Sequence, residues 1–94
     1  MSTLSERLRQ LREARRLTIR EFAAWIGKSP GYVSRVEGRG EIPSAELLCV
    51  IAGVYGIEPA ELLGLAKQSQ LERTERDIDA KHASALALYR KEQT

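Results

Sequence analysis

The chain has 94 residues, enough for one small domain, and its 43% apolar and 30% charged content is typical of a globular protein rather than a disordered one. Five aromatic residues and little alternation of β-branched with polar residues argue against a β-sandwich or a barrel. The net charge of +2 is spread unevenly: residues 7–39 carry nine cations and three anions, a net of +6, whereas residues 40–66 carry four anions and no cation, a net of −4. This asymmetry is typical of a protein with one face for a polyanion.

Two capping boxes predict the first two helices. The pattern Thr-x-x-Glu occurs at residues 3–6 and again at residues 18–21, and each is followed by apolar residues at helical spacing. We therefore expect helices over residues 3–15 and 18–26, and Gly27 should end the second because glycine readily adopts a positive φ.

A third short helix should follow at once. Ser29 can cap it, and Pro30 suits its first turn, where the missing N–H costs nothing. Only Val33 and Val36 are convincing inward-facing residues, so most of the surface of this helix is left for another purpose.

Two further helices complete the predicted core domain. We expect a loop over residues 38–43, a fourth helix from residues 43–44 to about Tyr55, and a fifth from residues 58–59 through Leu65, with Gly56 ending the fourth. The fold class is therefore all-α, with five short helices forming a domain over residues 1–66.

The character of the chain changes at Lys67. Residues 67–94 are strongly charged and favour helix, and Leu71, Ile78 and Ala85 lie seven residues apart. We expect an appended, weakly amphipathic helix that acts as a dimerisation or partner-docking arm, or else a partly disordered tail. Two heptads are too few to assign a coiled coil.

The second and third predicted helices form a helix-turn-helix. They are joined by a tight glycine-containing turn, and the second of the pair is poor in apolar residues, as a helix that enters the major groove of DNA must be. Its expected core positions are Phe22, Ala23, Ile26, Val33 and Val36.

Residues 4–66 resemble the Cro/repressor-type, or XRE-type, helix-turn-helix domain. The matching pieces are Leu11-Arg12, Leu17-Thr18, Phe22-Ala23-x-x-Ile26-Gly27, Ser29-x-x-Tyr32-Val33-Ser34-x-Val36-Glu37, Pro43-Ser44 and Leu48-x-x-Ile51-Ala52-x-x-Tyr55-Gly56-Ile57. The resemblance implies a compact, five-helix, lambda-repressor-like domain, here with a C-terminal helical extension. It also implies binding to double-stranded operator DNA, usually as a homodimer on an inverted repeat. A protein of this kind is a bacterial or phage regulator, cytoplasmic and associated with the nucleoid when bound to DNA.

The resemblance assigns base contacts to the third helix. Arg35 takes the central position, where an arginine can donate two hydrogen bonds to O6 and N7 of a guanine. Ser29, Gly31 and Tyr32 take the start of the helix that faces the groove. Glycine at position 31 lets the backbone approach closely, and the tyrosine can meet a phosphate or a thymine methyl group.

Phosphate contacts are expected on both sides of that surface. Lys28, Ser34 and Arg39 flank the third helix, and Thr18 and Arg20 lie at the N-terminus of the second.

A buried ion pair between Arg12 and Glu37 is also implied by the resemblance. An anion at position 37 would repel DNA if it faced outward, and pairing with Arg12 turns it inward. We therefore assign this pair a structural role and leave it out of the DNA-contacting set.

Several apolar residues are left over once the core is filled. Trp25 lies on a side of the second helix that is usually polar, and the fourth helix is apolar nearly all round. We expect these spare faces to pack against a second subunit or the tail helix. In the fourth helix they comprise Leu47, Cys49, Val50, Gly53 and Val54.

Nothing in the sequence predicts catalysis, a metal or a cofactor. The single Cys49 excludes an intramolecular disulfide and a multi-cysteine zinc site, and is most simply a small apolar residue of the kind often buried. The only histidine is His82, in the charged tail. The N-terminus is too charged for a secretory leader, and the longest apolar run, residues 47–57, is too short to span a bilayer.

The sequence thus predicts a sequence-specific transcriptional regulator, a dimeric repressor that enters the major groove. The alternative is an antitoxin or adaptor whose tail binds a protein partner and whose DNA binding serves autoregulation. A third interpretation is the controller protein of a restriction–modification system.

Overall fold

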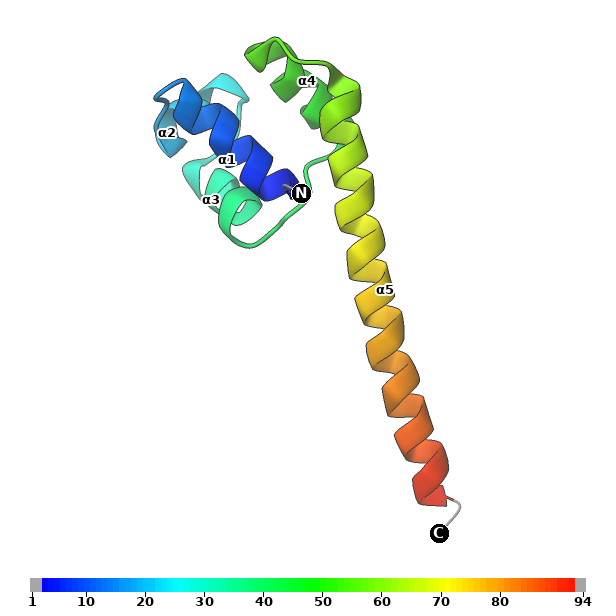
Figure 1. The fold of residues 1–94 in the computed structure, drawn as a ribbon. Helices are drawn as coiled ribbons and strands as arrows, with labels where there is room; N and C mark the ends of the chain where they lie inside the picture. The colour runs from blue at the N-terminus through cyan, green and yellow to red at the C-terminus, as the bar shows by residue number, and fades with distance from the viewer. Residues whose placement is uncertain (1–2, 93–94) are drawn as a thin grey trace.

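The computed structural model describes residues 3–92, and within that range the chain is all-α (Figure 1). Its elements are α1 (Leu4–Ala14), α2 (Ile19–Trp25), α3 (Pro30–Gly38), α4 (Ala45–Tyr55) and α5 (Pro59–Glu92). The predicted fold class is confirmed: a five-helix bundle with a long C-terminal helical extension.

The predicted helix starts are confirmed by their caps. Both capping boxes form, because the Thr3 and Thr18 hydroxyls accept from the backbone N–H three residues later, and the glutamate there accepts from the threonine N–H. Ser29 caps α3 by accepting from the N–H of Tyr32 at 3.1 Å. Ser44 caps α4 by accepting from the N–H of Leu47 at 3.2 Å. Four of the five helix starts were thus encoded locally.

Gly27 turns the chain sharply between α2 and α3. Its φ of +68° lies in the left-handed region, which a side chain disfavours, so the predicted glycine stop is confirmed. Gly56 closes α4 in the same conformation. Arg16 also has a positive φ, of 55°, at the turn after α1, which the sequence did not predict.

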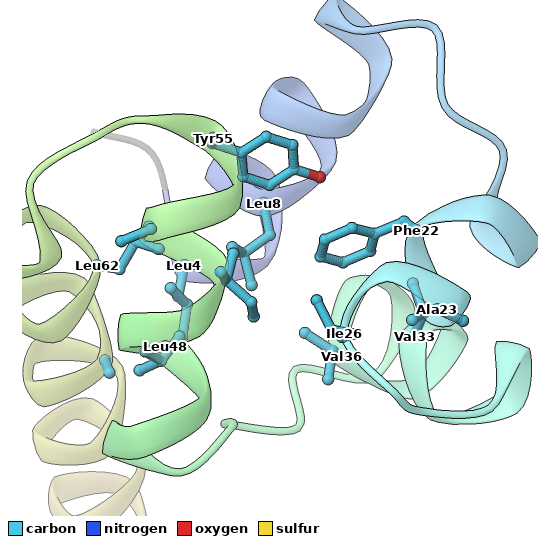
Figure 2. Close-up of a cluster of buried hydrophobic side chains, with 13 residues drawn as sticks. Leu4, Leu8, Phe22, Ala23, Ile26, Val33, Val36, Leu48, Tyr55 and Leu62 are labelled. Carbon is cyan, nitrogen blue, oxygen red and sulfur yellow. The ribbon is translucent and has the colours of Figure 1, made fainter.

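The core lies where α1, α2, α3 and α4 meet the first turns of α5 (Figure 2). All five core positions expected of the helix-turn-helix are buried. The rings of Phe22 and Tyr55 stack with their centroids 5.5 Å apart, which joins α2 to α4 across the centre of the domain. The largest fully buried side chains are Tyr55, Leu8, Leu48, Ile51, Leu62 and Val33.

Helix α5 corrects one prediction. The fifth helix does not end at Leu65 but continues unbroken to Glu92, because residues 65–92 contain no proline or glycine and favour helix throughout. Leu62 and Ala66 anchor its first turns in the core. Farther along, the helix extends away from the rest of the domain, and residues 70–90 are all exposed (Figure 1).

The spare apolar residues are only partly covered. Leu47 and Val54 pack against the core, but Trp25 is 55% exposed and Val50 is 50% exposed, so the tail helix does not bury them. Cys49 is exposed as well, which corrects the expectation of a buried thiol. Its position on α4, one residue after buried Leu48, turns it away from the core.

Candidate nucleic-acid interface

Helix α3 has one buried face and one exposed face. Val33, Val36 and Glu37 point into the domain, whereas Gly31, Ser34 and Arg35 are exposed. The exposed face carries no anion. Because α3 has few apolar residues, the rest of its surface presents polar, small and cationic groups to the outside. This division is what insertion into a major groove requires.

Arg35 lies at the centre of that exposed face and is held on two sides. Its Nε is 3.3 Å from a carboxylate oxygen of Glu41, and its guanidinium lies 5.8 Å from the ring centre of Tyr32. The side chain leans toward the start of the helix, where a Cβ added at Gly31 would lie 3.8 Å from Nη1. Gly31 therefore borders the space that Arg35 occupies.

Tyr32 connects this arginine to Lys28. The Lys28 ammonium lies 5.4 Å from the ring centre, so one cation from before α3 and one from within it lie near the same ring. Partial burial raises the pKa of the Tyr32 phenol above its ordinary value; the Glu41 charge raises it further, and Arg35 opposes both. The structure thus brings three predicted residues together: Lys28, Tyr32 and Arg35.

Ser29 and Thr18 serve as caps. In each, the hydroxyl oxygen accepts a backbone N–H at 3.1 Å. The hydroxyl proton is not used by the cap, and it can still be donated to a phosphate oxygen. Both residues lie at helix N-termini, where backbone N–H groups favour an anion.

The remaining predicted phosphate contacts are all exposed. Arg20 lies in the first turn of α2, Ser34 on the outer face of α3, and Arg39 at its C-cap. Ser34 is next to Arg35 in α3, whereas Arg20 belongs to α2 and Arg39 follows the end of α3.

The orientation of α3 is set by α1. The Arg12 Nε and Nη2 donate to the two carboxylate oxygens of Glu37 at 2.8 and 2.9 Å, with only 12% and 2% of the two side chains exposed. Hydrogen bonding to Glu37, ahead of any other cause, raises the pKa of Arg12. Ser5 adds a bond from its hydroxyl to the carbonyl of Val36 at 2.7 Å. The expected inward-facing ion pair is confirmed.

The loop after α3 is fastened to the tail helix, which the sequence did not predict. Arg73 of α5 donates to the carbonyl oxygen of Gly40 at 2.6 Å, and the Glu41 N–H donates to the carbonyl of Arg35 at 3.2 Å. Neither Glu41 nor Arg73 was a predicted site residue. No periodic pattern relates a loop residue to a helix 33 positions away, so only the folded chain reveals these contacts.

Among residues 3–92, no three His, Cys, Asp or Glu side chains are grouped to hold a metal ion. No helix in the same range is long and apolar enough to cross a membrane.

Comparison with known proteins places this geometry in a wider group. The profile of the helix-turn-helix domain family matches residues 3–65. A crystal structure of the clp gene regulator ClgR from Corynebacterium glutamicum is 31% identical, with a TM-score of 0.58 over 82% of this chain and 83% of that one. Another ClgR structure from the same organism is 39% identical, with a TM-score of 0.54 over 70% of this chain and 86% of that one. A search of curated proteins finds no match.

The structural likeness is longer than the family match. Because 82% of 94 residues is about 77, it exceeds the 63 residues from 3 to 65 and must continue along α5 beyond residue 65.

Proposed function

The chain belongs to the helix-turn-helix domain family, and we propose that it is a sequence-specific transcriptional regulator that binds operator DNA as a homodimer and acts as a repressor. The solved structures it is similar to are those of a gene regulator, which supports a role in transcription.

The observation that carries the proposal is the placement of Arg35. It is the one arginine on the exposed face of α3, and its guanidinium lies near Gly31 and Tyr32 at the start of the helix, the end that we propose enters the groove. A guanidinium there can donate two hydrogen bonds to O6 and N7 of guanine, a contact worth about 1–3 kcal/mol of discrimination against another base. Ser29, Gly31 and Tyr32 complete the proposed base-contacting surface.

The proposed backbone contacts surround this surface. Lys28, Ser34 and Arg39 lie along α3 and its ends, and Thr18 and Arg20 lie at the N-terminus of α2. Contacts of this kind fix the position of the protein on the duplex without distinguishing bases. They also make affinity fall steeply as salt rises, because each neutralised phosphate releases counterions.

The proposed homodimer divides the chain into two functional parts. Residues 1–66 form the DNA-binding domain, and residues 67–94 form an arm that contacts a second copy. Two α3 helices would then occupy successive major grooves, about 34 Å apart on an inverted repeat. Support comes from exposed apolar residues on the outer part of α5: Leu71, Ile78, Leu86, Leu88 and Tyr89.

The first experiment is selection from a random-sequence DNA pool with the full chain and Arg35→Ala in parallel. We expect an enriched inverted repeat whose guanine preference relaxes at one position per half-site in the variant. Arg90→Ala removes one exposed charge from the far end of α5 and is the matched control. Salt-sensitive binding without an enriched sequence would contradict the proposal.

A second experiment tests the arm. Sedimentation of the full chain should show a dimer, and Leu71→Asp with Ile78→Asp should dissociate it, whereas Gln70→Asp on the same helix should not. A monomer that still selects a DNA sequence would contradict the homodimer. It would favour the second candidate function, an antitoxin or adaptor, for which the same exposed apolar residues would contact a partner protein.

A further inference from the structure

We propose that Glu41 is a positioning residue for base recognition: its carboxylate holds the Arg35 guanidinium in the orientation that contacts guanine. This inference rests on the proposed function and deepens it, because it assigns part of the sequence preference to an anionic residue outside α3. Glu41 is neither a residue of the helix-turn-helix motif nor a cation, so neither criterion identifies it as a recognition residue.

Two hydrogen bonds join Glu41 to Arg35. The Glu41 backbone N–H donates to the Arg35 carbonyl at 3.2 Å, and the Glu41 carboxylate accepts from Arg35 Nε at 3.3 Å. The backbone bond fixes where the glutamate side chain begins, and the side-chain bond fixes where the arginine side chain ends. The loop is also bonded to α5, because Arg73 donates to the neighbouring Gly40 carbonyl at 2.6 Å.

The choice of nitrogen matters for recognition. An arginine has five N–H donors, one on Nε and two on each terminal nitrogen. Glu41 uses the Nε donor, which leaves the two terminal nitrogens to approach guanine end-on and donate to O6 and N7. The Tyr32 ring bounds the guanidinium on another side at 5.8 Å, so the side chain is restrained before DNA arrives. A group ordered in advance loses less conformational freedom on binding.

An anion at this position has an opposing effect on general affinity. The Glu41 side chain is 43% exposed, so its charge acts on a nearby phosphate backbone as well as on Arg35. Glu41 should therefore weaken binding to all DNA while it sharpens the preference for one base. A residue retained only for the stability of the loop would not separate these two quantities.

The experiment measures dissociation constants of the full chain for the selected operator, for operators with the contacted guanine replaced, and for unrelated DNA. Glu41→Gln keeps the shape of the side chain and removes its charge. We expect the guanine preference to fall roughly 3- to 10-fold, because a charge-assisted bond becomes a weaker neutral one. Affinity for unrelated DNA should stay the same or rise.

Two variants make the result specific. Glu46→Gln removes an exposed anion from the start of α4 and should leave the guanine preference unchanged. In an Arg35→Ala background, Glu41→Gln should have no further effect on base preference, because the residue through which it acts is gone.

The outcomes separate the two proposals. An unchanged guanine preference in Glu41→Gln overturns the inference, and so does an equal loss with Arg35 absent. A uniform loss of affinity for every sequence, together with a lower melting temperature, would show a merely structural role and also overturn it. If the wild-type chain selects no sequence, or Arg35→Ala leaves the selected sequence unchanged, the proposed function itself is contradicted. If Arg35→Ala changes the sequence preference and Glu41→Gln does not, only the inference about Glu41 is contradicted and the proposed function stands.

Discussion

Arg12 of α1 and Glu37 of α3 form a bidentate ion pair inside the domain, with N–O distances of 2.8 and 2.9 Å. Among the residues that the structure describes, Glu37 is the one charged residue that is buried, and the Arg12 side chain is nearly so. The residues that follow it, Gly38 at the end of α3 and Arg39 at the C-cap, are exposed, so the pair lies where the chain leaves the interior of the domain.

Removing one partner of this pair should be strongly destabilising. Glu37→Gln leaves the Arg12 charge buried without its counterion, so we expect a loss of about 3 kcal/mol in the free energy of unfolding. Urea unfolding followed by circular dichroism at neutral pH measures it. The control is Glu61→Gln, which breaks the exposed Arg7–Glu61 pair and should cost at most about 1 kcal/mol. Equal effects of the two substitutions would contradict the structural role assigned to Arg12 and Glu37.

The Tyr55 hydroxyl predicts an unusual response to substitution. The oxygen is buried and has no hydrogen-bond partner in the part of the chain that the structure describes. Because an unsatisfied buried hydroxyl is costly, Tyr55→Phe should be neutral or stabilise the domain by about 1 kcal/mol. The ring would keep its stacking on Phe22 and its contact with Arg15. A loss above about 1 kcal/mol in urea unfolding would show that the hydroxyl is bonded in solution.

The same residue predicts an alkaline transition. Burial, and secondarily the Glu37 charge, raises the pKa of Tyr55 from 10.0 to about 12. Between these values the unfolded chain has lost the proton and the folded chain retains it, so stability falls as pH rises from about 10 to 12, by roughly 3 kcal/mol. Tyr55→Phe should lack this loss of stability between about pH 10 and 12. Melting temperatures of both proteins at pH 8 and pH 11 compare them directly, and parallel declines would contradict the prediction.

Two glycines near the end of α3 should respond in opposite ways to alanine. Gly40 has a φ of +72°, and an added Cβ would lie 3.3 Å from the Arg73 guanidinium, so Gly40→Ala should cost about 1–2 kcal/mol. Gly38 lies within α3, where an added Cβ meets nothing within 4 Å, so Gly38→Ala should be neutral or stabilise by about 0.5 kcal/mol. Thermal unfolding of the two variants is the measurement, and the reverse order would contradict the described loop.

The proposed phosphate contacts predict a change in salt dependence. Lys28→Gln and Arg20→Gln should each reduce the slope of log affinity against log salt by about 1, and should weaken binding to all sequences alike. Lys81→Gln, which removes an exposed cation from the outer part of α5, should leave the slope unchanged. A shift in base preference instead of the slope would place the substituted residue against a base.

Local signals explain how much of the fold could be predicted from sequence. Thr18 with Glu21 and Ser29 with Pro30 specify helix starts through contacts three residues apart or less, and these formed as expected. Phe22 of α2 and Val33 and Val36 of α3 are buried as expected, because helical spacing places each on the apolar face of its own helix. The change of composition at Lys67 suggests a helix boundary near Leu65, but α5 continues through it. A change in composition does not by itself end a helix, and no proline or glycine follows Gly64 to interrupt α5.

The candidate site was less predictable than the fold. Placing Arg35 outward needed only the period of α3, but its contact with Glu41 depends on a loop that folds back along the helix. Cys49 shows a related limit, since α4 is apolar on several sides and composition does not say which side faces the core.

The unbroken course of α5 makes the tail a phased spacer. Leu62 and Ala66 are fixed in the core, and Leu71 and Ile78 follow them on the same unbroken helix. The direction in which Leu71 and Ile78 face is therefore set by the number of residues that separate them from the core. One residue inserted between Ala66 and Leu71 would turn the outer apolar residues by about 100°, whereas seven would advance them by about 10.5 Å and nearly restore their direction. In a dimer joined through those residues, the tail can therefore lengthen or shorten in steps of two helical turns, and each step resets the spacing of the DNA half-sites.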